Sequence, residues 1–92
     1  MSAILRRTVR FTGHVQGVGF RYTAKGIADG FDVVGYVRNL SDGTVELVAE
    51  GAEAEINKLI DEIRRKMEGF VRHHTTFDSP PTGEFSDFSI AR

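Results

Sequence analysis

Hydrophobic and polar residues alternate near the start of the chain and then change to a helical period. Val9 and Phe11 alternate with polar neighbours over residues 8–15, which predicts a strand with one buried face. Further on, apolar side chains recur at helical spacing, which predicts an amphipathic helix that ends near Gly30. The apolar face of this helix would consist of Phe20, Ala24, Ile27 and Ala28.

The rest of the pattern predicts a hairpin, a second helix and two more strands. Apolar runs at 33–39 and 44–49 predict two strands, and Asp42-Gly43 between them is typical of a hairpin turn. Residues 70–77 and 85–90 predict a fourth strand and a short terminal strand, separated by a proline-rich break. The second helix, which precedes them, has an apolar face formed by Ile56, Leu59, Ile60, Ile63 and Met67.

This order of elements is β-α-β-β-α-β with a short extra C-terminal strand. It is typical of an α+β two-layer sandwich of the ferredoxin-like type, with a mainly antiparallel sheet and both helices on one face. In its split β-α-β unit the first two strands run parallel, with a third strand between them. The loop 17–21 and Asn39 are therefore expected at one edge of the sheet, with backbones about 10 Å apart.

Composition and charge are those of an ordinary globular domain. The 92 residues fit a single domain over 1–92, and contents of 40% hydrophobic and 27% charged residues favour neither disorder nor a fibrous fold. A net charge of -1 argues against general binding of nucleic acid. Because cysteine is absent, disulfides, a thiolate nucleophile and Cys-ligated zinc are excluded.

Apolar runs in the chain are shorter than a signal peptide or a membrane span requires. The sequence therefore favours a cytoplasmic protein that does not bind membranes. We expect a monomer. We also expect no metal and no cofactor, since no cluster of metal ligands is evident.

The segment from Gly13 to Arg21 carries the strongest chemical signal. Gly17 and Gly19 permit positive φ and close backbone approach, so several N–H groups can point together at an anion. Arg21 falls in the first turn of the predicted helix, where a cation opposes the helix dipole by roughly 0.3 to 1 kcal/mol. A bound phosphate would reverse that effect. Alone, the same residues also fit an ordinary Gly-rich turn with a solvated arginine.

Two segments resemble the signatures of the acylphosphatase family. The first is Gly13-His14-Val15-Gln16-Gly17-Val18-Gly19-Phe20-Arg21, and the second is Gly35-Tyr36-Val37-Arg38-Asn39-Leu40-Ser41-Asp42-Gly43-Thr44-Val45-Glu46. They occur in the expected order, and the resemblance is close over residues 8–51. His14 stands where Arg or Lys is common and Tyr36 where Trp is common, but neither change affects the inferred catalytic pair.

The resemblance implies hydrolysis of the carboxyl–phosphate bond of a small acyl phosphate to a carboxylate and inorganic phosphate. By similarity, Asn39 would position the attacking water. The phosphoryl group would be bound by Arg21 and the backbone amides of Val15, Gln16, Gly17, Val18, Gly19 and Phe20. These residue types suit such roles, because a guanidinium fork matches phosphate oxygens and a neutral amide orients water without repelling the dianion. Catalysis would come mainly from positioning and charge stabilisation.

Two other functions fit parts of the sequence. Residues 16–22 resemble the aromatic motif of RNA-binding domains of similar topology, although that motif belongs within a strand. The chain is also similar to the acylphosphatase-like N-terminal domain of hydrogenase-maturation carbamoyltransferases, which implies a domain that is non-catalytic or that handles carbamoyl phosphate. It lacks their zinc-finger cysteines, and we expect a free-standing enzyme of 92 residues.

The remaining polar candidates are expected to be structural. His73 and His74 are adjacent and would face opposite sides of a strand, which disfavours joint ligation of a metal. Arg38 would face away from Asn39 and be solvated or ion-paired, and His14 is expected on the surface. An acidic start of the second helix, which suits the helix dipole, would consist of Glu50, Glu53 and Glu55.

Overall fold

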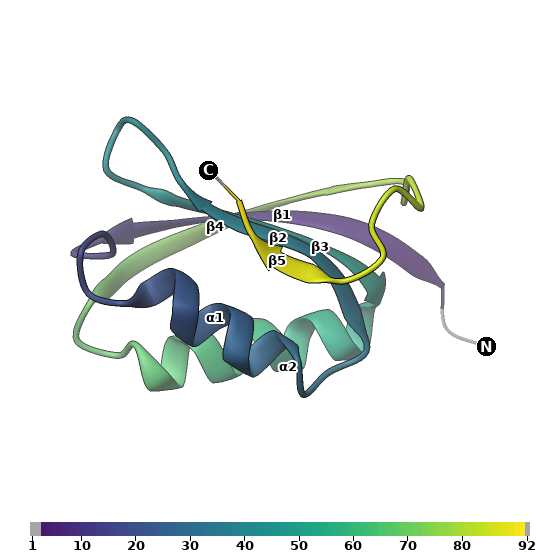
Figure 1. The fold of residues 1–92 in the computed structure, drawn as a ribbon, viewed down its shortest axis with the longest axis horizontal. Helices are drawn as coiled ribbons and strands as arrows, with labels where there is room; N and C mark the ends of the chain where they lie inside the picture. Colours follow the sequence, from purple (N-terminus) through teal and green to yellow (C-terminus); the bar gives the residue numbers. More distant parts are fainter. Residues whose placement is uncertain (1–2, 92) are drawn as a thin grey trace.

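The computed structural model describes residues 3–91 as one five-stranded sheet with two helices on one of its faces (Figure 1). The predicted ferredoxin-like α+β sandwich with a short C-terminal strand is confirmed. No helix within the described residues has the length and apolar character needed to cross a membrane. In chain order the elements are β1 (Ile4–Gly13), α1 (Phe20–Ala28), β2 (Val33–Asn39), β3 (Val45–Ala52), α2 (Glu53–Lys66), β4 (Val71–Ser79) and β5 (Phe88–Ile90).

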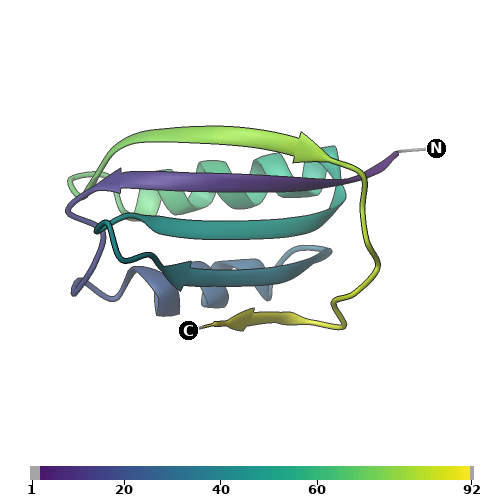
Figure 2. The same ribbon diagram turned by 90° about the horizontal axis from the view of Figure 1, so that it is seen from above.

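The strand order of the sheet is β4-β1-β3-β2-β5 (Figure 2). β1 and β2 both pair antiparallel with β3, so they run parallel to each other on either side of it. Their C-terminal ends therefore lie at the same edge of the sheet, at the left of Figure 2. This edge is where the loop after β1 and the turn after β2 meet.

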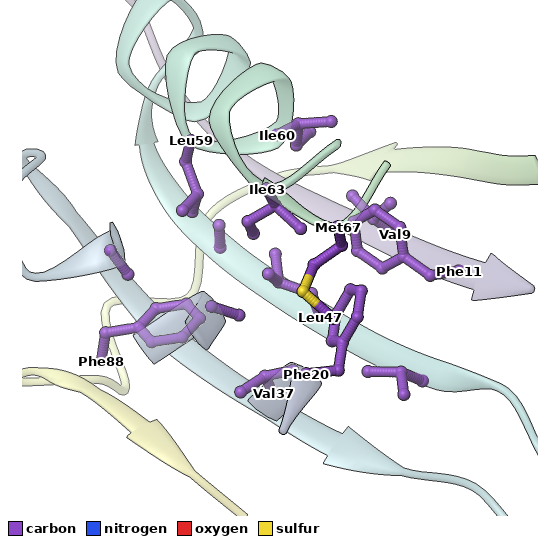
Figure 3. Close-up of a cluster of buried hydrophobic side chains, with 14 of the residues drawn as sticks. Val9, Phe11, Phe20, Val37, Leu47, Leu59, Ile60, Ile63, Met67 and Phe88 are labelled. Carbon is purple, nitrogen blue, oxygen red and sulfur yellow. The ribbon is translucent and has the colours of Figure 1, made fainter. Parts of the chain in front are cut away.

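The core lies between the sheet and the two helices, and it also fixes the start of α1 (Figure 3). Val9 and Phe11 of β1 are fully buried, as their alternation predicts. The ring of Phe20 at the start of α1 packs against that of Phe11 with 5.0 Å between centroids. The first turn of α1 is thereby held at the end of β1. Other members of the cluster in Figure 3 are Val37, Leu47, Leu59, Ile60, Ile63, Met67 and Phe88.

The bounds of the first strand differ from the prediction of 8–15. β1 begins at Ile4, because Arg6 and Arg7 continue the pairing with β3 while acidic partners neutralise their side chains. It ends at Gly13, whose φ of 124° accompanies a register shift in the pairing with β4. Val15 lies in the loop after β1 but is also buried, so in the sequence it continues the strand-like alternation of apolar and polar residues beyond the end of the strand. Likewise, the terminal strand is confined to Phe88–Ile90 rather than 85–90.

Glu50 is a buried residue of β3, so its predicted place at the start of α2 is wrong. The strand extends to Ala52, and only Glu53 and Glu55 lie in the first turn of α2. The Glu50 carboxylate accepts hydrogen bonds from the backbone N–H of Thr82 and of Gly83, each at 3.0 Å, and from Arg6 at 3.2 Å. Burial raises the pKa of Glu50, but these hydrogen bonds outweigh burial and hold the pKa below its ordinary value. Glu50 thus fastens the connection between β4 and β5 to the sheet.

Replacing Glu50 by Gln should lower the free energy of unfolding by about 1 to 3 kcal/mol, since the amide NH2 would face donors instead of accepting from them. Urea unfolding at neutral pH measures the loss, with the exposed Glu68→Gln as the control. The difference from the unaltered chain should shrink as the pH falls through the lowered pKa of Glu50, because both side chains are then neutral. Equal stability at neutral pH would contradict this role.

Candidate active site

The loop between β1 and α1 is held firmly at both ends. Val15 and Phe20 are 1% and 2% exposed, so their side chains anchor the loop in the core. The His14 N–H donates to the carbonyl oxygen of Phe70 at 2.9 Å. Between these anchors Gly17 and Gly19 have φ of 76° and 78°, positive values that glycine adopts readily. The conformation of the loop is therefore fixed by residues around it.

The backbone N–H groups of this loop are left without partners inside the described chain. From Val15 to Phe20, no N–H donates a hydrogen bond to another residue of 3–91. α1 begins after Gly19 with neither a side-chain cap nor an acidic residue in its first turn. Unpaired amides at a helix N-terminus attract anions through their hydrogen-bonding capacity and the helix dipole. The loop can therefore offer several donors to a phosphate.

Gln16 connects this loop to the turn that follows β2. Its side-chain amide donates to the carbonyl oxygens of Leu40 at 2.8 Å and Thr44 at 2.9 Å. The loop is thus held beside Asn39, the last residue of β2. The sequence predicts only a backbone-amide role for Gln16. The one sequence signal for its side-chain role, the link between the loop and the turn after β2, is a long polar side chain at the start of a Gly-rich loop.

Asn39 carries a buried acceptor that has no donor among residues 3–91. The atom is Oδ1, and its burial without a hydrogen bond is costly unless water or a ligand occupies the position. On the same strand, Arg38 is engaged elsewhere: its Nε pairs with Glu46 at 2.8 Å, and the Tyr36 hydroxyl bonds to that carboxylate at 3.0 Å. Arg38 is therefore ion-paired, whereas the buried Oδ1 of Asn39 has no hydrogen-bond partner among residues 3–91.

Arg21 lies in the first turn of α1 and is half-buried. None of the ion pairs formed within residues 3–91 includes it. A cation here faces the positive end of the helix dipole without a neutralising partner. Such a placement is favourable only when an anion binds nearby.

The topology places the loop, Arg21 and Asn39 at the same edge of the sheet. β1 leads into the loop, α1 packs on β2, and the C-terminal ends of both strands lie side by side across β3 (Figure 2). The edge combines unpaired N–H donors and a guanidinium with one unpaired acceptor. This combination can hold an anion by its oxygens and a water molecule by its hydrogen.

His74, another candidate from the sequence, lies on β4, on the opposite side of β1 from β3. The ring of His74 stacks beside Phe11, with 6.1 Å between centroids, and burial is the main cause that lowers its pKa. No group of three or more His, Asp or Glu able to hold a metal occurs within residues 3–91. Residues 16–22 lie in the loop and in α1 rather than in a strand, which disagrees with the RNA-binding motif.

Comparison with known proteins gives consistent matches over nearly the whole chain. The Acylphosphatase family model matches residues 7–90. Acylphosphatase of Paenarthrobacter aurescens (strain TC1) is 46% identical over 87 residues, which cover 94% of this chain and 93% of that protein. The crystal structure of acylphosphatase from Bacillus subtilis has a TM-score of 0.85 at 30% identity and covers 96% of this chain and 99% of that one. T. kodakarensis HypF has a TM-score of 0.78 at 31% identity, covering 100% of this chain but 12% of that one.

Proposed function

The chain belongs to the acylphosphatase family of enzymes, and we propose that it hydrolyses acyl phosphates with Arg21 and the loop amides on the phosphoryl group and Asn39 on the water. This assignment rests on one observation: hydrogen-bond donors and a hydrogen-bond acceptor that lack partners lie at the same edge of the sheet. Unpaired donors lie in the loop after β1, and an unpaired buried acceptor lies at the end of β2. The reaction needs both, since it joins an anionic phosphoryl group to a neutral water.

The phosphoryl group is held by a positive charge and by hydrogen-bond donors that point at its oxygens. The N–H groups from Val15 to Phe20 donate to its nonbridging oxygens, and the Arg21 guanidinium donates a planar pair of N–H groups. Charge on these oxygens is redistributed as the bond to the acyl oxygen breaks. Donors already fixed by the buried Val15 and Phe20 need no reorganisation at that moment, which stabilises the transition state.

Asn39 positions the nucleophile. Its Oδ1 accepts one hydrogen of a water, which turns an oxygen lone pair of that water toward phosphorus. The water oxygen bonds to phosphorus as the bond from phosphorus to the carboxyl oxygen breaks, and the carboxylate leaves with that electron pair. Because Asn is not basic, the proton passes to a phosphate oxygen or to solvent. A carboxylate is a weak base, so its departure needs no general acid.

Asn39→Ala should lower kcat for benzoyl phosphate by about 100- to 1000-fold, the range for loss of one preorganised polar group. KM should change little, because Asn39 acts on the water rather than on the substrate. Hydrolysis is measured in the presence of a chelator, and we expect the unaltered chain to remain active under that condition. Carbamoyl phosphate is assayed in parallel as a second substrate. Asn57→Ala, at an exposed position of α2, is the matched control. Full activity of a folded Asn39→Ala variant would rule out this role.

A further inference from the structure

An open groove adjoins the loop on its β4 side. Its volume is about 910 Å³, and it lies between the loop after β1, the β2–β3 turn and the connection from α2 to β4. These three connections lie together at the left of Figure 2. The groove includes His14, Val15 and Gln16, so it begins where the amides of the loop begin. A molecule held by those amides has the groove open beside it.

The lining of the groove carries one fixed positive charge, Arg72, and no carboxylate. His14 and His73 also line it. Arg72 is exposed and takes part in no ion pair within residues 3–91. Two acidic residues, Asp42 and Glu68, are sequence neighbours of lining residues. The Oδ1 of Asp42 already accepts a hydrogen bond from the Thr44 hydroxyl at 2.6 Å. Glu68, the other one, is exposed and lies outside the lining.

The walls of the groove are fixed to the loop. The Phe70 carbonyl accepts the His14 N–H at 2.9 Å, and the two rings meet edge to face at 6.2 Å. Arg72 is held close to Gly13: a Cβ built there would lie 3.4 Å from the Arg72 Cγ and 2.8 Å from its backbone nitrogen. The stem of Arg72 therefore packs on β1, which limits the positions open to its guanidinium.

Resting on the proposed function, we propose that this groove receives the acyl part of the substrate and selects acyl phosphates whose acyl group carries a second anionic group. Arg72 is the specificity-determining residue. Its guanidinium pairs with a carboxylate at the far end of the acyl group while the loop and Arg21 hold the phosphoryl group. An acetyl group is too short to gain from this contact. A longer acyl group with an uncharged end would gain only from apolar contacts.

A matched pair of substrates tests the groove: benzoyl phosphate with a carboxylate at the para position, and benzoyl phosphate with a methyl group there. The para position prevents internal attack on the acyl phosphate and points the charge away from phosphorus. The measured quantity is the ratio of kcat/KM for the carboxylate substrate to that for the methyl substrate. Arg72→Gln should lower this ratio roughly fivefold to tenfold, with hydrolysis of the methyl substrate unchanged. Arg72→Glu should lower it further.

Arg65→Gln makes the same change of charge on α2, at a residue paired with Glu62, and should leave the ratio unchanged. An unchanged ratio in active Arg72→Gln would overturn the groove proposal alone. An equal loss on both substrates would also overturn it, because Arg72 would then act on the phosphoryl group or on the fold. Failure of the unaltered chain to hydrolyse either substrate would instead overturn the proposed function, and the groove proposal with it.

Discussion

Arg21→Ala should abolish most hydrolysis of acyl phosphates without destabilising the fold. We expect kcat/KM to fall by about 1000-fold or more, the effect of removing an arginine from a phosphoryl-transfer site. Stability should stay within about 1 kcal/mol of the unaltered chain and rise at low ionic strength, because a cation at the start of α1 opposes the helix dipole. Loss of activity together with unchanged or higher stability is characteristic of substitution at a functional residue. Substitution at a structural residue would lower both activity and stability.

Added inorganic phosphate provides a second readout of the same site. A ligand that binds only the folded state raises the free energy of unfolding, by about 2.7 kcal/mol at a hundred times its Kd. Urea unfolding should show this rise for the unaltered chain and a much smaller one for Arg21→Ala at equal phosphate. Arg64→Ala, at an exposed position of α2, should behave like the unaltered chain in both assays. Unchanged activity in folded Arg21→Ala would end the assignment of Arg21.

Gly35→Ala should unfold the protein or lower its free energy of unfolding by more than about 3 kcal/mol. Gly35 has φ of 147°, and a Cβ there would lie 1.8 Å from the Val48 carbonyl oxygen and 2.8 Å from its carbon. Both atoms belong to the backbone of β3, so relief requires that β2 and β3 separate. β2 ends in Asn39, and activity should disappear together with the fold. Circular dichroism and urea unfolding measure the outcome.

Gly26→Ala is the matched control, with the opposite expected sign. Gly26 lies in α1, and a Cβ there would meet no atom within 4 Å other than its chain neighbours and the adjacent backbone of its own helix. Replacing a helical Gly by Ala should raise the free energy of unfolding by roughly 0.5 to 1 kcal/mol. If both variants had the stability of the unaltered chain, the tight approach of β2 to β3 at Gly35 would not matter to the fold.

The helices and strands were predictable because their signals are local. The faces defined by Val9 and Phe11, and by Phe20 and Ala24, are buried as their periods predict. Boundaries failed where burial depends on a distant partner. Glu50 is an acidic residue close to the second helix, which is typical of a helix start. Its carboxylate is nevertheless buried under Thr82 and Gly83, 32 and 33 residues further along the chain. A charged residue in a strand shows no apolar period, so its burial cannot be inferred locally.

By itself the sequence determined the fold class, the family and the two residues proposed for catalysis, Arg21 and Asn39. Local periodicity sets the order of elements, and that order restricts the topology enough to bring both residues to one sheet edge. Only the tertiary structure decided how the site is held and what surrounds it. The link from Gln16 to Leu40, the unpaired Oδ1 of Asn39 and the groove beside Arg72 depend on the distances between separate segments. Such distances follow from the packing of the whole domain, which no local pattern in the sequence specifies.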